Sequence, residues 1–381
     1  SRRINGRCES KEKSVQIDRR LISHFDWTLL LLALTLVFLG IVTIYSANYN
    51  ITEAHAGGLP SRQLVWLGLG LVAMLTALAF DYHYIDRVAY PFYGLMLLLL
   101  VLVLFIGHSG GGSQRWINLG LFRLQPSEPA KVAIVLMMAK YFQYSEPAKG
   151  YLLRDLWAPF VLVAPLVILT LVQPDLGTAI ILGVVFISMI LMGGLRMRSF
   201  LYLVGAGLAF LPAGWHFLKP YQRGRILTFL DPDRDPLGAG YHVIQSKIAV
   251  GSGRLFGKGY LDGTQNRLDF LPAQHTDFIF AVFSEEWGFV GCLALLLLYF
   301  ALIAYAVRLV ERAKDRLGAL LVFGMIAIFF WHVIINVAMV TGIMPVVGVP
   351  LPLFSYGGSS LASMMFAIGL MINVSMRRYV F

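Results

Sequence analysis

Asp277 is the ionisable residue with the strongest claim to a chemical role. It lies in the string HTDFIFAVFSEEWG, residues 275–288, where a long polar stretch meets an apolar run. A carboxylate at the border of a membrane is costly to keep, and it is therefore a candidate functional group. Such a group can remove the proton from an attacking hydroxyl as a general base. We therefore interpret Asp277 as the candidate catalytic residue.

Eight cationic side chains lie in segments that we expect on the same side of a membrane as Asp277. Guanidinium and ammonium groups bind the oxygens of a lipid phosphate or diphosphate strongly. A diphosphate leaving group gains charge in the transition state, and fixed cations stabilise that charge. Together with the aspartate they would form a transferase that uses a lipid-linked donor, although structural ion pairing among loop residues is equally open. The eight are Arg115, Arg123, Lys131, Arg223, Arg225, Lys247, Arg254 and Lys258.

Other polar residues near these segments allow alternative interpretations. His275 is either a proton relay for Asp277 or a hydrogen-bonding residue at a helix start. Glu285 and Glu286 are either catalytic or partners of neighbouring helices. Two polar residues inside an apolar run are expected to hydrogen-bond neighbouring helices, as polar groups within membranes do; they are His332 and Asn336.

The elements that must position these residues are transmembrane helices. The chain of 381 residues is 58% hydrophobic and 14% charged, with a mean hydropathy of +0.71, whereas soluble domains carry about 25% charged residues. Its apolar runs reach the roughly 20 residues that a bilayer requires. We therefore predict an all-α polytopic membrane protein. Ten spans are expected, near 27–46, 63–80, 88–107, 128–144, 156–172, 176–194, 199–218, 278–307, 317–341 and 352–376.

The net charge of +10 is explained by membrane topology, and no nucleic-acid partner is expected. If the N-terminus is cytoplasmic, 19 of the 31 Lys and Arg residues fall in cytoplasmic segments. Basic residues in short loops set orientation, while long loops are exempt. The distribution therefore predicts that both termini are cytoplasmic and that the 59-residue loop 219–277 is extracytoplasmic.

Residues 1–22 are expected to form a cytoplasmic tail. The segment is polar and basic and has no apolar core, so it is not a cleaved signal peptide. It is either a disordered tail or a segment that touches anionic lipid. Cys8 falls in this tail and Cys292 in a span, so no disulfide is expected. The sequence has no Cys/His cluster of the kind that binds metal.

Two short outward segments carry further candidates. In 108–131, Ser127 is expected to cap a helix whose first turn holds Glu128. Lys131 follows Glu128 by three positions, so the two share a helix face and can form an ion pair. In the tight turn 173–178, Asp175 either caps the next helix or has a functional role.

The long loop and its neighbours have three further features. Residues 241–250 have helical spacing of apolar side chains, interrupted by Gln245 and Lys247, which predicts an amphipathic helix in the membrane interface. The span 278–307 would be about 45 Å long as one helix, longer than the apolar core of a bilayer. Residues 348–360 form a Pro-rich and Gly-rich segment whose backbone N–H groups either face an anion or permit close packing.

Five strings give the chain a specific resemblance. They are GSQRWINLGLFRLQPSEPAK, QPDLGT, DPLGAGYHVIQSKIAVGSG, FLPAQHTDFIFAVFSEEWG and PVVGVPLPLFSYGGSS. In this order they resemble the SEDS family (shape, elongation, division and sporulation), over essentially the whole region 23–381. The amino-acid sequence of the long loop is more similar to that of the elongation branch, RodA, than to that of the division branch, FtsW. The resemblance implies a SEDS-like transmembrane domain in the bacterial cytoplasmic membrane that polymerises lipid II into peptidoglycan strands.

The resemblance also implies roles for individual residues. Asp277 matches the essential aspartate of the family. The substrate-binding positions that it implies are Arg115, Arg123, Glu128, Lys131, Asp175, Gln245 and Lys247. Three residues depart from the family pattern: Pro129 replaces an aliphatic residue, and Ala273 and Gln274 stand where a charged pair is common. The departure at 273–274 argues against a local salt bridge before HTD.

By this resemblance the reaction is an inverting glycosyl transfer with an undecaprenyl diphosphate leaving group. Arg115, Arg123 and Lys247 would hold the diphosphate, and a divalent cation, Mg²⁺ or Mn²⁺, would bridge to Asp277. The expected partners are a class B penicillin-binding protein, which supplies the transpeptidase, lipid II and membrane lipids. Two alternatives stay open: a flippase for lipid-linked precursors and a non-catalytic scaffold for the penicillin-binding protein.

Overall fold

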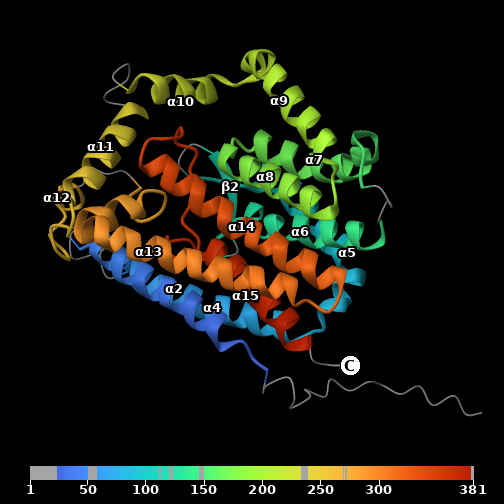
Figure 1. The fold of residues 1–381 in the computed structure, drawn as a ribbon. Coiled ribbons are helices and arrows are strands. Elements are labelled where there is room, and N and C mark those ends of the chain that lie inside the picture. Colours follow the sequence, from blue (N-terminus) through green and yellow to red (C-terminus); the bar gives the residue numbers. More distant parts are fainter. Residues whose placement is uncertain are drawn as a thin grey trace, which may run out of the picture.

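The computed structural model describes residues 24–49, 58–110, 113–118, 120, 123–145, 150–232, 239–268, 270 and 273–378. The predicted tail, residues 1–22, lies outside these ranges. Ten long helices form the bundle in Figure 1. They are α2 (Trp27–Ala47), α4 (Gly58–Ala79), α5 (Ile85–Ile106), α6 (Ser127–Tyr144), α7 (Trp157–Val172), α8 (Leu176–Gly193), α9 (Met197–Phe217), α13 (Ile279–Glu311), α14 (Arg316–Val340) and α15 (Gly358–Arg377).

Shorter elements connect the long helices. The described part of the long loop contains the helices α10 (Pro220–Leu230), α11 (Ala239–Ser252) and α12 (Thr264–Arg267). Two 3₁₀ turns, η1 (Tyr82–Tyr84) and η2 (Leu153–Leu156), precede α5 and α7. An antiparallel sheet of three short strands has the order β1 (His108–Gly110), β2 (Ser113–Asn118) and β3 (Arg123–Leu124).

The all-α polytopic architecture is confirmed, and each predicted span overlaps one long helix. Within the described ranges, eight helices are long and apolar enough to cross a membrane by length and composition. The two others are α6, which carries buried charges, and α9, for which the apolar part that the structure describes, Met197–Ala209, is shorter than a span. The number of ten spans and the cytoplasmic position of both termini therefore stay predictions.

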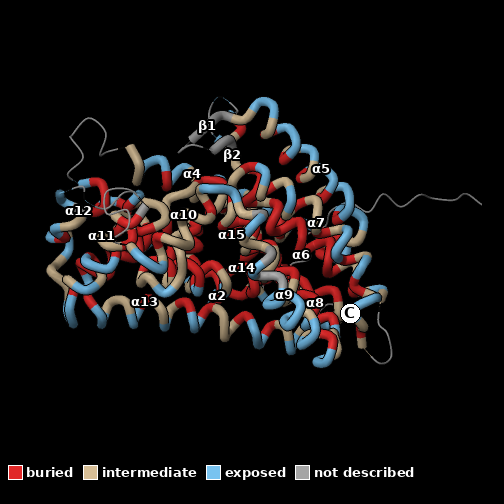
Figure 2. Tube along the Cα trace, turned by 90° about the horizontal axis from the view of Figure 1, so that it is seen from above, coloured by how far each residue is buried: buried red, intermediate tan, exposed pale blue. Residues whose placement is uncertain are grey.

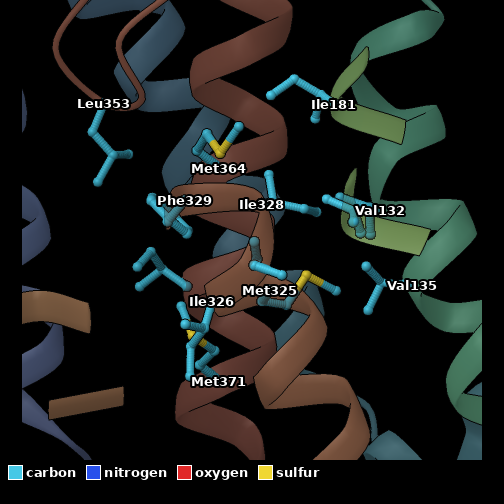
Figure 3. Close-up of a cluster of buried hydrophobic side chains, with 14 of the residues drawn as sticks. Val132, Val135, Ile181, Met325, Ile326, Ile328, Phe329, Leu353, Met364 and Met371 are labelled. Atoms are coloured by element: carbon cyan, nitrogen blue, oxygen red, sulfur yellow. The ribbon is translucent and has the colours of Figure 1, made fainter. Parts of the chain in front are cut away.

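The centre of the bundle consists of α6, α14 and α15, whose residues are mostly buried (Figure 2). The surrounding helices expose large apolar side chains such as Phe38, Leu98 and Phe300, as expected for surfaces that face lipid. Side chains from α6, α8, α14 and α15 interlock in the core, as Figure 3 shows. Two of them, Ile181 and Ile328, belong to α8 and α14.

A glycine lets α14 approach α6 closely. A Cβ atom built on Gly324 would lie 2.3 Å from Cγ1 of Val135, a distance that no side chain at position 324 could tolerate without a shift. A second glycine, Gly358, performs the same role at the start of α15, where an added Cβ would lie 1.9 Å from the Trp66 ring of α4. Close packing is therefore one use of the glycines in the segment 348–360.

One end of the bundle carries segments 108–131, 173–178 and 219–277, and we call it the loop end. Here α9 leads out of the bundle to α10, and α11 returns towards α13 (Figure 1). The predicted helix 241–250 is confirmed as α11, which is two residues longer at each end. Ser246 attaches it to α14 by donating a 2.7 Å hydrogen bond to the carbonyl of Val340. Its position in a membrane interface stays a prediction.

The helix expected over 278–307 is present as α13, but it is not straight. Gly288 has φ 64° and ψ −164°, so α13 is kinked after its first turns. The chain that follows α11 fills this kink: Phe289 N–H donates to the carbonyl of Arg254 at 2.8 Å, and Lys258 N–H donates to that of Glu285 at 3.0 Å. Only glycine accepts this backbone conformation readily.

Two acidic residues before the kink hold neighbouring segments. Oε1 of Glu285 accepts hydrogen bonds from Lys258 Nζ at 2.5 Å and from the Thr264 backbone N–H at 2.9 Å. Glu286 accepts a hydrogen bond from Ser46 of α2. Both side chains are buried, and their hydrogen bonds support the interpretation that they are structural partners of neighbouring helices.

The starts of α6 and α15 also differ from the prediction. Ser127 is the first residue of α6 and not its cap, because Pro126 precedes it with helical φ and ψ. Instead the Ser127 hydroxyl lies 3.5 Å from Oδ2 of Asp175. The last helix begins at Gly358, six residues later than expected, because the prolines at 350 and 352 belong to an irregular segment before it.

Candidate functional site

A cavity of about 1070 Å³ lies at the loop end of the bundle. Its lining comes from the start of α6, strand β2, α8, α10, α11, α14, the turn 273–278 and the segments 346–350 and 356–360. This volume is at the upper end of the range for small-molecule sites, so the cavity suits a large polar head group. Of the eight predicted site residues, five line it: Arg115, Glu128, Lys131, Asp175 and Asp277.

The turn that carries Asp277 is held by its backbone. Asn336 Nδ2 donates to the carbonyl of Asp277 at 2.9 Å. The Ser355 hydroxyl donates to the carbonyl of Thr276 at 2.7 Å, and the backbone N–H of Tyr356 donates to that of His275 at 2.9 Å. Other segments thus donate hydrogen bonds to the backbone carbonyls of residues 275–277 and fix the turn. These bonds do not involve the Asp277 carboxylate, and Asp277 lines the cavity.

The surroundings of Asp277 make it a stronger base. Burial in the cavity raises the pKa of its carboxyl from 3.8 to about 6. The positive charges of Arg115 and Arg225 oppose this rise, and the negative charge of Asp175 adds to it. A carboxylate with a pKa near 6 is still ionised at neutral pH and holds a proton more strongly than an ordinary aspartate.

Arg115 and Asp175 form one unit at the cavity wall. Nη1 of Arg115 lies 3.5 Å from Oδ1 of Asp175, and the arginine also donates to the backbone carbonyls of Gln173 and Pro174. Asp175 caps α8 by accepting hydrogen bonds from the backbone N–H of Thr178 at 3.2 Å and its hydroxyl at 2.9 Å. The capping role of Asp175 is therefore confirmed, and the same residue fixes the arginine.

The predicted pair on α6 is present and buried. Lys131 Nζ lies 2.8 Å from Oε2 of Glu128, and their side chains are 2% and 5% exposed. Lys131 Nζ is also 2.9 Å from Nε2 of His332 on α14. His332 and Asn336 therefore both bond neighbouring segments, as predicted for polar groups of a buried span.

Gly348 packs against the catalytic candidate. It has φ +75°, and a Cβ atom added to it would lie 3.3 Å from Oδ2 of Asp277. Gly348→Ala is therefore expected to strain the backbone by about 1 kcal/mol and to crowd the carboxylate. We expect a lower melting temperature and a catalytic rate reduced by about tenfold, since small displacements of catalytic groups are costly.

The control for this variant is Gly183→Ala. Gly183 lies within α8, and an added Cβ there meets no atom within 4 Å. The thermal unfolding and the catalytic rate of both variants would be compared with those of the unmodified chain. If Gly348→Ala behaves like Gly183→Ala in both measurements, the contact with Asp277 has no consequence.

Three of the predicted site residues do not line the cavity. Arg123 is exposed on β3. Gln245 and Lys247 lie on α11. The Lys247 side chain packs against Gly342, which follows the end of α14. Their assignment to substrate binding stays a prediction, and the structure does not bring them together with Asp277.

Several other polar residues, which were not among the predicted site residues, also line the cavity. Arg225 of α10 is one, and its charge acts on Asp277. His242 of α11 stacks on Phe278, with ring centroids 6.3 Å apart, and burial together with the charge of Arg225 lowers its pKa. The others include Gln125 and His332. The only sequence signal for Arg225 was its place among the outward cations.

The fit of a divalent cation depends on the carboxylates of the cavity. No group of three or more His, Cys, Asp or Glu suited to a metal occurs among the described residues. Glu128 faces Lys131, and Asp175 is engaged by Thr178 and Arg115. Asp277 could still hold Mg²⁺ or Mn²⁺ together with diphosphate oxygens, because Mg²⁺ sites often use one or two carboxylates and substrate phosphates.

Comparisons with known proteins agree with this fold and indicate a family. A family model described as "Cell cycle protein", FtsW/RodA/SpoVE, matches residues 26–380. Peptidoglycan glycosyltransferase MrdB of Escherichia coli K12 is 41% identical over 93% of this chain and 94% of its own length. Peptidoglycan glycosyltransferase RodA of Treponema pallidum is 35% identical over 94% and 99%, respectively.

Solved structures give the same result. A chain from a study of how a peptidoglycan synthase complex coordinates polymerisation and crosslinking has a TM-score of 0.80 and 35% identity, over 94% of this chain and 99% of that one. The crystal structure of the rod shape determining protein RodA of Thermus thermophilus has a TM-score of 0.69 and 32% identity, over 94% and 98%. The chain belongs to the FtsW/RodA/SpoVE family, the SEDS family that its sequence motifs indicated.

Proposed function

We propose that this protein is a peptidoglycan glycosyltransferase of the elongation type that polymerises lipid II at the outer face of the bacterial cytoplasmic membrane. The observation that carries the proposal is the half-buried Asp277 carboxylate, facing a cavity that also contains Arg115, Arg225 and Lys131. A base and several cations around one space are what glycosyl transfer from a lipid diphosphate requires. The names of the relatives support the same activity.

The proposed reaction is a direct displacement with inversion. The Asp277 carboxylate takes the proton from the 4-hydroxyl of the acceptor GlcNAc, and that oxygen attacks the anomeric carbon of the donor sugar. The bond to the diphosphate oxygen breaks, and undecaprenyl diphosphate leaves with the electron pair. Arg115, Arg225 and Lys131 would stabilise the charge that develops on the diphosphate. One carboxylate is sufficient, because no covalent glycosyl-enzyme intermediate forms.

A divalent cation is a further part of the proposal. When bound, Mg²⁺ or Mn²⁺ would neutralise charge on the diphosphate oxygens. Asp277 would be its protein ligand. The cations of the cavity serve the same electrostatic purpose from the protein side.

The rate is expected to fall in mild acid. A base must be ionised, and with a pKa of about 6 the ionised fraction of Asp277 falls about tenfold between pH 7 and pH 5. An aspartate with the ordinary pKa of 3.8 would stay almost fully ionised over this range. Initial polymerisation rates between pH 5 and pH 8, at lipid II concentrations well below saturation, measure the effect, because these rates report the pKa of the free enzyme.

His275→Asn separates this titration from that of the neighbouring histidine. Burial lowers the pKa of His275, which also lines the cavity. We expect the variant to keep the same acid limb as the unmodified enzyme. A rate that stays constant down to pH 5 would contradict the raised pKa of the base.

The direct test is polymerisation of purified lipid II by the full chain in complex with its transpeptidase. We propose a class B penicillin-binding protein as that partner, in line with the synthase complex described above. The expected product is a ladder of glycan strands that a muramidase digests. Transfer of labelled lipid II across sealed vesicles without polymer would indicate a flippase instead. A complex that shows neither activity would indicate a scaffold.

The core below the cavity favours the enzyme over the flippase. A flippase needs a polar path from one face of the membrane to the other. Buried apolar side chains pack between α6, α8 and α14 below Lys131, and they include Val135, Met325 and Ile328 (Figure 3). The polar groups of the described cavity are thus confined to the loop end.

A further inference from the structure

His332 of α14 is a buried histidine with a defined tautomer. Its side chain lies 2.7 Å from the carbonyl of Ile328 through Nδ1 and 2.9 Å from Lys131 Nζ through Nε2. A carbonyl only accepts hydrogen bonds, so Nδ1 carries the proton. An ammonium group only donates, so Nε2 is the acceptor. The imidazole is therefore neutral, and its unprotonated nitrogen faces Lys131.

Lys131 is consequently held from two sides. Glu128 on its own helix supplies the negative charge at 2.8 Å, and His332 supplies a neutral acceptor from a different helix. Glu128 alone would fix Lys131 only relative to α6. The additional bond fixes the ammonium relative to α14 as well, and all three side chains line the cavity.

The same helix also fixes the base. Asn336 follows His332 by four positions, so both lie on one face of α14. Its amide donates to the carbonyl of Asp277 at 2.9 Å and to that of Val349 at 2.7 Å. The close approach of α14 to α6 at Gly324 holds this face against Lys131. One helix face thus contacts both the cation and the segment that carries the base.

We propose that His332 is a positioning residue for the transfer reaction. His332 accepts a hydrogen bond from Lys131 and so fixes the position of the ammonium group relative to Asp277. A diphosphate oxygen bound to that ammonium group is thereby also positioned relative to the base. This inference rests on the proposed function, because it assigns Lys131 to the substrate. His332 itself does not touch the reacting atoms.

The test compares His332→Leu with His332→Gln in the full chain with its transpeptidase. Leucine removes the acceptor, whereas a glutamine side chain can still offer a carbonyl oxygen to Lys131 and an N–H to Ile328. We expect polymerisation of lipid II to fall by about tenfold or more in His332→Leu, since loss of about 1 Å in alignment is that costly. His332→Gln should stay within about threefold of the unmodified enzyme.

Trp331→Phe is the matched control. Trp331 is the neighbouring residue on α14, and its indole N–H donates to the Ser188 hydroxyl of α8 at 2.9 Å, away from the cavity. The control therefore loses one interhelical hydrogen bond of α14 without touching Lys131. We expect polymerisation within about twofold of the unmodified rate, because this bond does not align a catalytic group.

Melting temperatures provide a measurement that does not depend on activity. If the bond to Lys131 exists, the double variant Lys131→Met/His332→Leu loses less melting temperature than the sum of the single variants. A wild-type rate for His332→Leu, an equal loss in both His332 variants, or additive melting shifts would overturn the positioning role. Absence of polymer from the unmodified complex would refute the proposed function instead, and the melting shifts would still test the bond.

Discussion

Replacing Asp277 by asparagine is expected to lower the rate of glycan polymerisation by about 10²–10⁴-fold, the usual contribution of a general base. Asparagine has nearly the same shape, and the hydrogen bonds that hold the turn go to the backbone carbonyls of residues 275–277. The fold should therefore survive the change. The initial rate with purified lipid II measures the effect.

Stability gives this variant a second, independent expectation. The pKa of the Asp277 carboxyl is raised in the folded protein above its ordinary value of 3.8. At pH values above 3.8 the ionised carboxylate therefore lowers the free energy of unfolding. Removing the charge should leave the melting temperature at pH 7 unchanged or slightly higher. A large drop in melting temperature would mean that the loss of activity reflects unfolding.

Asp262→Asn is the control for the change of charge. Asp262 also belongs to the long loop, but its side chain is 60% exposed and pairs with Arg267 at 3.4 Å. Both rate and stability should stay near those of the unmodified chain, because exposed ion pairs contribute little. An unchanged rate for Asp277→Asn would exclude Asp277 as the base.

The parts of the site that the sequence predicted are those defined by short separations along the chain. The pairing of Glu128 with Lys131 follows from a spacing of three on one helix, and the cap by Asp175 follows from its place before an apolar run. Asp277 stands out because a charge at the end of an apolar span is unusual. Local patterns are sufficient for all of these.

Contacts across long separations could not be derived in the same way. Lys131 and His332 are 201 positions apart, and Arg225 reaches the cavity only because α10 folds back from α9. Gln245 and Lys247 were placed at the substrate by resemblance alone. Their helix was predicted correctly, but which of its sides faces the cavity depends on how α11 packs.

The kink of α13 illustrates the limit for the fold. A glycine inside an apolar run is compatible with a continuous helix, so Gly288 gave no clear signal. The conformation depends on the chain after α11, whose Arg254 and Lys258 backbones bond to α13 on either side of that glycine. Hydrogen bonds from a distant segment thus decided a local conformation, which periodicity does not reveal.

Replacing Lys131 by methionine is expected to be the most destabilising of the changes considered. Methionine fills much of the same space, but it leaves the Glu128 carboxylate buried without its counter-ion. Breaking a buried ion pair in this way costs about 3–5 kcal/mol. The melting temperature of the purified protein should fall by several degrees or more, and polymerisation should fall by at least about 100-fold.

The double variant Glu128→Gln/Lys131→Met separates stability from function. With both charges removed, no buried charge is left unpaired, so most of the lost melting temperature should return. Polymerisation should not return, because the cation that faces the diphosphate is still absent. Lys140→Met, on the same helix but partly exposed beside Asp86, should cost only about 1 kcal/mol and leave the rate unchanged. Recovery of both stability and rate in the double variant would mean that the pair only supports the fold; recovery of stability alone assigns the ammonium to the substrate.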